Sequence, residues 1–169
     1  MVFQFRKGIR EDIELFIRFL DEIKAGMSQK DWFYVDPADV VRSMMAEGTM
    51  EFWMAFHENQ LAAVFSVLFP GLQPYNYGYD LGLCEEDLLR VIHMDTAAVH
   101  ADYRGYGLQE RLVQMAEQEL SGKGRRILLS TVHPENRFSL NNMQRRRYEI
   151  QRWVEKYGSE RLILQKEIF

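Results

Sequence analysis

One feature constrains the fold of this chain more than any other. It is an apolar, strand-like run that leads through two glycines into an amphipathic helix. Residues 88–99 are β-rich, and Leu108–Leu120 carries its apolar residues at helical spacing. The turn between them, HADYRGYG, contains Arg104, Gly105 and Gly107. Because a glycine weakens a helix by about 1 kcal/mol relative to alanine, two glycines at a helix start require an explanation.

Exposed amides at the start of this helix offer one explanation. The first N–H groups of a helix have no intrahelical partner, and the helix dipole adds about half a positive charge, so phosphate groups bind there readily. Arg104 adds a cationic side chain to the same turn. The turn therefore suits a pyrophosphate, although the same glycines would also serve a purely structural tight turn. The dinucleotide pattern G-x-G-x-x-G fails, because Glu110 stands where its last glycine should be.

The rest of the chain alternates between strand and helix patterns. Asp36 is expected to cap a second helix that begins at Pro37, and residues 72–87 are expected to be loop with some extended structure. The other patterns predict strands at 3–5, 126–132, 148–154 and 161–169, a hairpin over 50–71, a helix at 9–27 and a weaker helix within 133–147. This order predicts a mixed α/β fold with a single domain over residues 1–169.

Length, charge and cysteine content narrow the classes of function. The chain of 169 residues has the size of one domain, and its formal net charge of -4 argues against a dedicated nucleic-acid binder. Cys84 is the single cysteine, and no apolar run approaches the roughly 20 residues that span a bilayer. We therefore expect a soluble, cytoplasmic protein that binds neither nucleic acid nor membrane. The four scattered histidines predict no metal site.

The glycine turn and the order of the elements resemble the GNAT superfamily of N-acetyltransferases. In that family, a strand ending in valine leads into Arg/Gln-x-x-Gly-x-Gly/Ala, whose amides hold the pyrophosphate of acetyl-coenzyme A. Arg104 and Gly107 match this pattern, whereas Gln109 stands where glycine or alanine is usual. The resemblance implies a central, mostly antiparallel twisted sheet flanked by helices. It also implies acetyl-coenzyme A as co-substrate, bound by Val99, Arg104, Gly105, Tyr106, Gly107, Gln109 and Asn136.

A second stretch, STVHPENRFSLNNMQRRRYEI, carries the same resemblance. Family members place an asparagine after the next strand and a small residue three positions later, and Asn136 and Ser139 fit. The resemblance puts Asn136 near the pantetheine or phosphate end of the cofactor. Many relatives have a tyrosine seven residues after that asparagine as general acid, but this chain has Met143, which cannot donate a proton to sulfur. The sequence therefore identifies no general acid.

Asp95 is the candidate general base for the reaction that the resemblance implies. In that reaction a neutral amine attacks the thioester carbonyl directly, and a backbone N–H near Val99 polarises the carbonyl. Strand alternation puts Asp95 and Val99 on the face that also carries His93, which is the alternative base because its ordinary pKa suits proton transfer. A structural role is open for both: Asp95 could cap a bulge or pair with an arginine, and His93 could be half-buried and hydrogen-bonded.

Two other groups of residues allow more than one interpretation. The arginine run at 145–147 could attract the 3′-phosphate of coenzyme A or an acidic partner, or it could form the solvated end of a helix. The aromatic residues at 32–34, with the tyrosines of 75–79, could wall an acceptor pocket or pack in the core.

The sequence thus predicts an N-acetyltransferase that transfers the acetyl group of acetyl-coenzyme A to a primary amine. The acceptor could be a small metabolite, a drug-like amine, a peptide terminus or a lysine. The alternative is a non-catalytic acyl-coenzyme A-binding sensor or partner-binding module, which Met143 favours. The final alternating strand could pair with another chain, so we expect a monomer or a homodimer.

Overall fold

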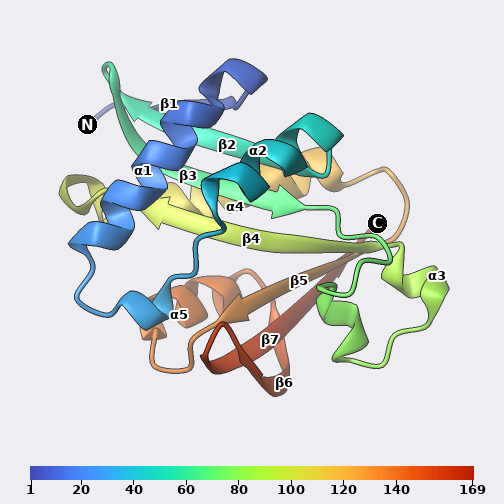
Figure 1. Ribbon diagram of the computed structural model, residues 1–169. Helices are drawn as coiled ribbons and strands as arrows, with labels where there is room; N and C mark the ends of the chain where they lie inside the picture. Colours follow the sequence, from blue (N-terminus) through green and yellow to red (C-terminus); the bar gives the residue numbers. More distant parts are fainter. The chain divides into compact units, whose positions relative to one another are not determined.

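The computed structural model describes residues 1–169 and confirms a mixed α/β fold with a mostly antiparallel sheet. Seven strands pair in the order β1-β2-β3-β4-β5-β7-β6 (Figure 1). The strands are β1 (Gln4–Lys7), β2 (Met50–His57), β3 (Gln60–Leu68), β4 (Val91–Val99), β5 (Arg126–Val132), β6 (Glu149–Lys156) and β7 (Ser159–Ile168). The α-helices are α1 (Ile13–Gly26), α2 (Ala38–Glu47), α3 (Glu85–Leu88), α4 (Leu108–Leu120) and α5 (Arg137–Arg145). Four 3-10 turns, η1 (Arg10–Asp12), η2 (Lys30–Trp32), η3 (Tyr77–Tyr79) and η4 (Ala101–Tyr103), connect them.

The chain forms two compact units. The first contains Met1–Leu68 and Asp95–Glu119, and the second contains Phe69–Met94 and Leu120–Phe169. Strand β4 contributes its first residues to the second unit and its last residues to the first.

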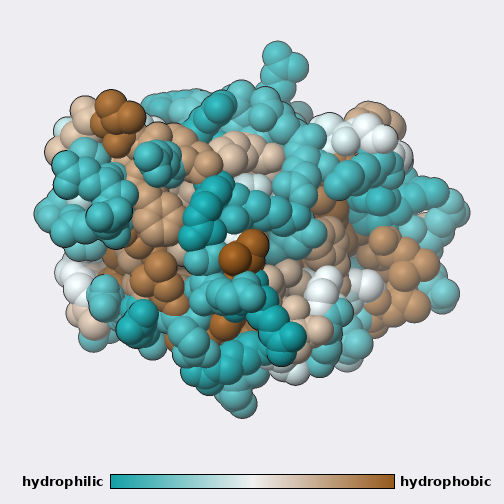
Figure 2. All heavy atoms as spheres, turned by 90° about the horizontal axis from the view of Figure 1, so that it is seen from above, coloured by the Kyte–Doolittle hydropathy of each residue, from teal (hydrophilic) through white to brown (hydrophobic).

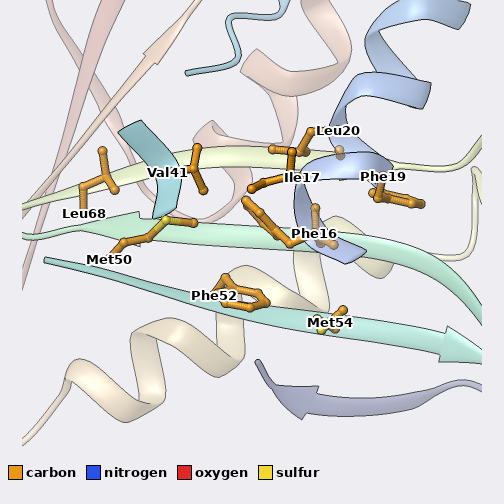
Figure 3. Packing of buried hydrophobic residues seen from close by; sticks show 11 residues of the cluster. Phe16, Ile17, Phe19, Leu20, Val41, Met50, Phe52, Met54 and Leu68 are labelled. Carbon is orange, nitrogen blue, oxygen red and sulfur yellow. The ribbon is translucent and has the colours of Figure 1, made fainter. Parts of the chain in front are cut away.

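Helices cover both faces of the strands in the first unit. Figure 1 shows α1 and α2 in front of β2 and β3, with α4 behind them. Met50, Phe52 and Met54 alternate along β2 on the side of α1 and α2, where the ring of Phe16 lies 4.7 Å from that of Phe52 between centroids (Figure 3). The intervening Trp53 is buried as well. Burial of successive residues is expected for a strand that has helices on both of its faces.

In the second unit, β5 pairs with β7 and β7 with β6, both antiparallel, so β6 is the edge strand. The start of β4 pairs parallel to β5, from Val91 opposite Ile127 to His93 opposite Leu129. Parallel neighbours require a crossover connection, and α4 lies within the segment that connects these two strands.

Most of the predicted elements are confirmed within a few residues at their ends, but two expectations are wrong. Pro37, not Asp36, is the N-cap of α2, and no side chain caps that helix. The carboxyl of Asp36 instead accepts a hydrogen bond from Tyr34. Residues 72–87 are mostly loop and turn, as expected, but their regular parts are η3 and the first three residues of α3 rather than extended structure. The side chain of Asn76 accepts a hydrogen bond from the N–H of Gly78 at 2.8 Å, which favours the turn over a strand.

Hydrophilic residues cover much of the surface seen in Figure 2, and hydrophobic residues show in several separate places. No helix combines the length and the apolar composition that crossing a bilayer requires. No group of three or more His, Cys, Asp and Glu side chains is arranged to hold a metal ion.

Candidate functional site

The glycine turn at the end of β4 is anchored to the first unit by aromatic side chains. Tyr103 is buried, and its hydroxyl donates a hydrogen bond of 2.7 Å to Oε1 of Gln60 at the start of β3. The ring of Phe3 lies 5.8 Å from Tyr103 and 5.5 Å from Tyr106 between centroids. These contacts attach the last residue of η4 and the following turn to Gln60 at the start of β3 and to Phe3, which directly precedes β1.

Both glycines of the turn adopt the left-handed conformation that the sequence suggested. The φ angles are 83° at Gly105 and 70° at Gly107, and a Cβ added to either would meet no atom within 4 Å. The carbonyl of Gly107 accepts the first helical hydrogen bond, from the N–H of Arg111 at 3.0 Å. The amides of residues 108–110 therefore lack intrahelical acceptors. The space that a Cβ of Gly105 or Gly107 would fill, just before these amides, is open.

Arg104 is exposed beside this turn, and its side chain forms no hydrogen bond or ion pair within the chain. Val99 ends β4 and is partly buried, as is Gln109 in the first turn of α4. Tyr106 is 49% exposed, so the segment from Arg104 to Gly107 is accessible to a ligand. Five of the predicted cofactor residues and Val99 thus lie on one short, accessible segment.

Asp95 has polar neighbours within the first unit, in the second half of β4. Its Oδ2 accepts hydrogen bonds from Oγ1 of Thr96 at 2.9 Å and from Oγ of Ser66 on β3 at 3.2 Å. The Ser66 hydroxyl in turn accepts the N–H of Thr96 at 3.3 Å. Both bonds end on Oδ2, so Oδ1 has no donor within the chain. This oxygen is available to accept a proton.

Asp95 is set to titrate close to neutrality. Burial, and next the neighbouring Asp36 carboxyl, raise the pKa of Asp95 from 3.8 to about 6. The hydrogen bonds from Thr96 and Ser66 favour the anion and limit the rise. Asp95 is therefore ionised at neutral pH and yet more basic than an ordinary carboxylate, which is the balance that a general base requires.

Asp36 and Tyr34 are brought close to Asp95 by the segment that leads into α2. Burial raises the pKa of Asp36, and the hydrogen bond from Tyr34 opposes the rise. Burial, followed by the charge of Asp36 and the hydrogen bond to it, raises the pKa of Tyr34, and Asp95 adds to this effect. Tyr34 is 41% exposed, so this polar group reaches the surface.

His93 lies in the second unit in a different environment. It is 1% exposed, its ring stacks on Tyr77 at 3.8 Å between centroids, and its Nε2 accepts the N–H of Tyr77 at 3.1 Å. Burial, followed by the charge of Lys156, lowers the pKa of His93 from 6.5 to about 3. The ring is therefore neutral, and the lone pair that could accept a proton is already used.

The asparagine motif of the second unit caps a helix. Oδ1 of Asn136 accepts the N–H of Ser139 at 3.1 Å, which makes Asn136 the N-cap of α5. The spacing of three residues in this motif is that of a side-chain cap. Met143 is buried in α5, and the backbone N–H of the buried Tyr148 donates to its carbonyl at 3.1 Å. The methionine that replaces the expected tyrosine is thus a core residue.

The tyrosines predicted as a possible pocket wall do not share one environment. Tyr77 is buried, and its hydroxyl lies 2.5 Å from that of Tyr157. Tyr75 and Tyr79 are exposed at 43% and 48%. In the arginine run, Arg145 ends α5 and Arg147 has a φ of 68° just beyond it.

Comparison with known families identifies the class of protein. A family model described as Acetyltransferase (GNAT) family matches residues 19–147, more than half of the chain. The chain belongs to the GNAT acetyltransferase family. It is therefore an acyltransferase by family. No curated protein matches the sequence of this GNAT chain.

Solved structures share the fold of this chain over nearly its whole length. An acetyltransferase of the GNAT family from Streptococcus pneumoniae has 14% identity, covers 99% of this chain and 100% of its own, and gives a TM-score of 0.74. Arabidopsis thaliana NAA60 in complex with acetyl-CoA has 14% identity, 99% coverage of both chains and a TM-score of 0.76. The NatC complex bound to Gag peptide and CoA has 14% identity, 100% coverage of both chains and a TM-score of 0.74.

Three polar residues around Asp95 in this GNAT chain were missed or misread from the sequence. Ser66 is fully buried within the apolar run of β3, and Thr96 follows Asp95 on β4. A lone hydroxyl in an otherwise apolar buried strand is a usable signal, because a buried hydroxyl needs a partner. Asp36 was misread as a helix cap because Asp-Pro before a helical pattern is the usual signature of one.

The partly buried carboxylate of Asp95 is expected to lower the stability of the GNAT fold above about pH 6. The unfolded chain ionises Asp95 near 3.8 and the folded chain near about 6, so the penalty develops between these values and is complete above the higher one. Asp95→Asn removes it while keeping an oxygen for both hydroxyls. We expect the variant to gain up to about 3 kcal/mol at about pH 8 and nothing at about pH 3.5.

Urea denaturation of both proteins at the two pH values measures this difference. Asp21→Asn, which replaces an exposed carboxylate on α1, is the control and should change little at either pH. A stability difference between Asp95→Asn and the parent chain that does not depend on pH would contradict the electrostatic explanation.

Proposed function

We propose that this chain is an N-acetyltransferase that transfers the acetyl group of acetyl-coenzyme A to a primary amine, with Asp95 as general base. The observation that carries the proposal is the free Oδ1 of a partly buried carboxyl whose pKa is raised to about 6. This carboxyl stands on the strand that leads directly into the glycine turn. The family assignment and the acetyl-CoA complex of Arabidopsis thaliana NAA60 support the choice of donor.

The glycine turn fits the diphosphate of the donor. A Cβ at Gly105 or Gly107 would occupy space that is open in this structure, and the start of α4 just after it would offer backbone N–H groups to an anion. Arg104 would add a positive charge, and Tyr106 and Gln109 would flank the diphosphate.

A backbone N–H near Val99 would polarise the carbonyl of the donor. Acetyl-coenzyme A supplies an acyl group activated as a thioester. Asn136 would contact the donor through its side-chain amide nitrogen, because the helix cap uses only Oδ1.

Asp95 would take the proton that the amine must lose. Most primary amines are protonated at neutral pH, so Oδ1 accepts one proton from the ammonium. The neutral amine then forms the N–C bond with the acetyl carbonyl as the C–S bond breaks, and the leaving coenzyme A thiolate takes up the second proton that the nitrogen loses. Asp95 releases its proton to water after the transfer. Such a base contributes about 10²–10⁴-fold to the rate. We propose Asp95 rather than His93 because Nε2 of His93 already accepts the N–H of Tyr77.

Among primary amines, the N-terminus of a peptide is one acceptor to test, because the similar NatC complex was solved with a Gag peptide. Lysine side chains and small-molecule amines complete the classes of acceptor. We further propose that residues 1–169 act as a single domain, in the cytoplasm, as a monomer or a homodimer.

A thermal-shift screen followed by a turnover assay tests the proposal. We expect acetyl-coenzyme A and coenzyme A to raise the melting temperature, because a ligand that binds only the folded chain stabilises it. Release of free thiol should then depend on an amine from a panel of peptides, lysine derivatives and small amines. Stabilisation without turnover on any amine would support the acyl-coenzyme A sensor, and no stabilisation would overturn the donor itself.

A further inference from the structure

A cavity of about 470 Å³ lies in the first unit. It is lined by one face of α1, by the first residues of β3 and by the segment around η4. Its volume is within the range of about 300–1,000 Å³ that is usual for small-molecule sites. Strand β4 runs from Asp95 to its end at Val99 over about 13 Å, and the residues that follow this end line the cavity. The cavity is therefore distinct from the surroundings of Asp95.

Part of the lining is apolar. Phe19 is buried, and Leu15 and Leu61 are partly buried. Leu15 and Phe19 are four residues apart on α1, so they lie on the same face of the helix. This part of the lining can remove an apolar group of a ligand from water.

Two opposite charges on the same face of α1 have no partner in the chain. Arg18 and Glu22 are exposed, line the cavity and lie one helical turn apart. Side chains at this spacing can pair, but arginine before glutamate is the weaker order, and neither side chain forms a hydrogen bond or an ion pair. Glu14, on which the charge of Arg18 also acts, is paired with Arg42. A ligand could therefore bind both charges without breaking an existing contact.

The other walls add polar groups that are only partly used. Oε1 of Gln60 accepts the hydroxyl of Tyr103 at 2.7 Å, which leaves the NH₂ of the same amide for a ligand. Nδ1 of His100 accepts the N–H of Asp102 at 3.3 Å, so the proton of the neutral ring is on Nε2. Gln60 and His100 thus supply hydrogen-bond donors, and Asp102 supplies an exposed carboxylate.

We propose that this cavity binds a free α-amino acid with an apolar side chain. The carboxylate of the ligand would bind Arg18 and the NH₂ of Gln60, its ammonium would bind Glu22, and its side chain would contact Phe19 and Leu61. The balance of charges carries this choice, because a simple carboxylate would leave Glu22 unmatched and a simple amine would leave Arg18 unmatched. The proposal does not depend on the reaction proposed above.

Titration of ¹⁵N-labelled protein with leucine, in the absence of any acyl donor, tests the site by NMR. The backbone amide signals of Phe19, Leu61 and His100 should shift until the site is saturated. Leucinamide lacks the carboxylate and 4-methylpentanoate lacks the ammonium, so each should bind about tenfold more weakly, as expected for one lost charged hydrogen bond. No saturable shift of these signals with leucine, methionine or phenylalanine, or equal affinity for leucine and its two analogues, would overturn the proposal.

Two variants assign the ends of the ligand. Arg18→Gln should weaken leucine about tenfold and leave leucinamide unchanged, whereas Glu22→Gln should weaken leucine similarly and leave 4-methylpentanoate unchanged. Arg10→Gln is the matched control, because Arg10 is an exposed arginine of η1 whose side chain forms no hydrogen bond. It should bind leucine as the parent chain does, and so should Asp95→Asn. Equal losses in Arg10→Gln and Arg18→Gln, or a loss in Asp95→Asn, would place leucine elsewhere and contradict the site.

Discussion

Asp95→Asn is expected to lower kcat by about 10²–10⁴-fold, the usual contribution of a general base, without a comparable loss of donor affinity. Asparagine is close to aspartate in size and can accept hydrogen bonds from the hydroxyls of Ser66 and Thr96, but it cannot take a proton from the amine. Steady-state kinetics with saturating donor and an active amine measure kcat, and calorimetry with coenzyme A measures affinity. The exposed Asp21→Asn serves again as control.

The pH dependence adds a second criterion for Asp95. A protonated base is inactive, so kcat/KM of the parent chain should fall as the pH drops through about 6, the pKa of Asp95. This limb should be absent in Asp95→Asn. Equal kcat in the two proteins across the pH range would remove Asp95 from the mechanism.

Gly107→Val should weaken the binding of coenzyme A by about 10–100-fold, as expected for the loss of hydrogen bonds worth about 1.5–3 kcal/mol to a charged group. A Cβ at Gly107 meets no protein atom within 4 Å, so the valine would project into the open space that the diphosphate is proposed to use. The backbone there has a φ of 70°, which costs a β-branched residue about 1–2 kcal/mol. Calorimetry with coenzyme A measures the affinity.

Gly124→Val separates lost binding from backbone strain. Gly124 also has a positive φ, of 85°, and open space around its missing Cβ, but it lies between α4 and β5 and not in the glycine turn. Both variants should lower the melting temperature, and only Gly107→Val should lose affinity. Unchanged affinity in Gly107→Val, or equal losses in both variants, would contradict the proposed diphosphate site.

Elements with a strong period and clear ends could be predicted from the sequence. Leu108–Leu120 is a helix with the predicted bounds, because glycines precede it, SGKG follows it and its apolar residues repeat at helical spacing. Residues 72–87 could not be assigned in the same way. The 3-10 turn η3 and the four-residue helix α3 are too short to show a period, and side-chain hydrogen bonds such as that of Asn76 decide their form.

The candidate site was only partly accessible to sequence reasoning. The glycine turn is a local motif, so its positive φ angles followed from residue type and position. The environment of Asp95 depends on β3 and on the segment before α2, which are distant in sequence. No local pattern predicts the hydrogen bond from Ser66 or the effect of the Asp36 charge on the pKa of Asp95. Strand alternation put Asp95, the candidate base, and His93, the alternative, on the same face, whereas their surroundings shift their pKa values in opposite directions.

The aromatic contacts of the glycine turn bear on the thermodynamics of donor binding. Phe3 packs on Tyr106, and Tyr103 is fixed to β3 through Gln60, so these contacts support the turn from the protein side. A binding segment that is preorganised loses little conformational entropy when its ligand arrives. Truncating Phe3 to alanine would transfer that ordering to the binding step, and the entropy of association would become less favourable although no atom that faces the ligand had changed.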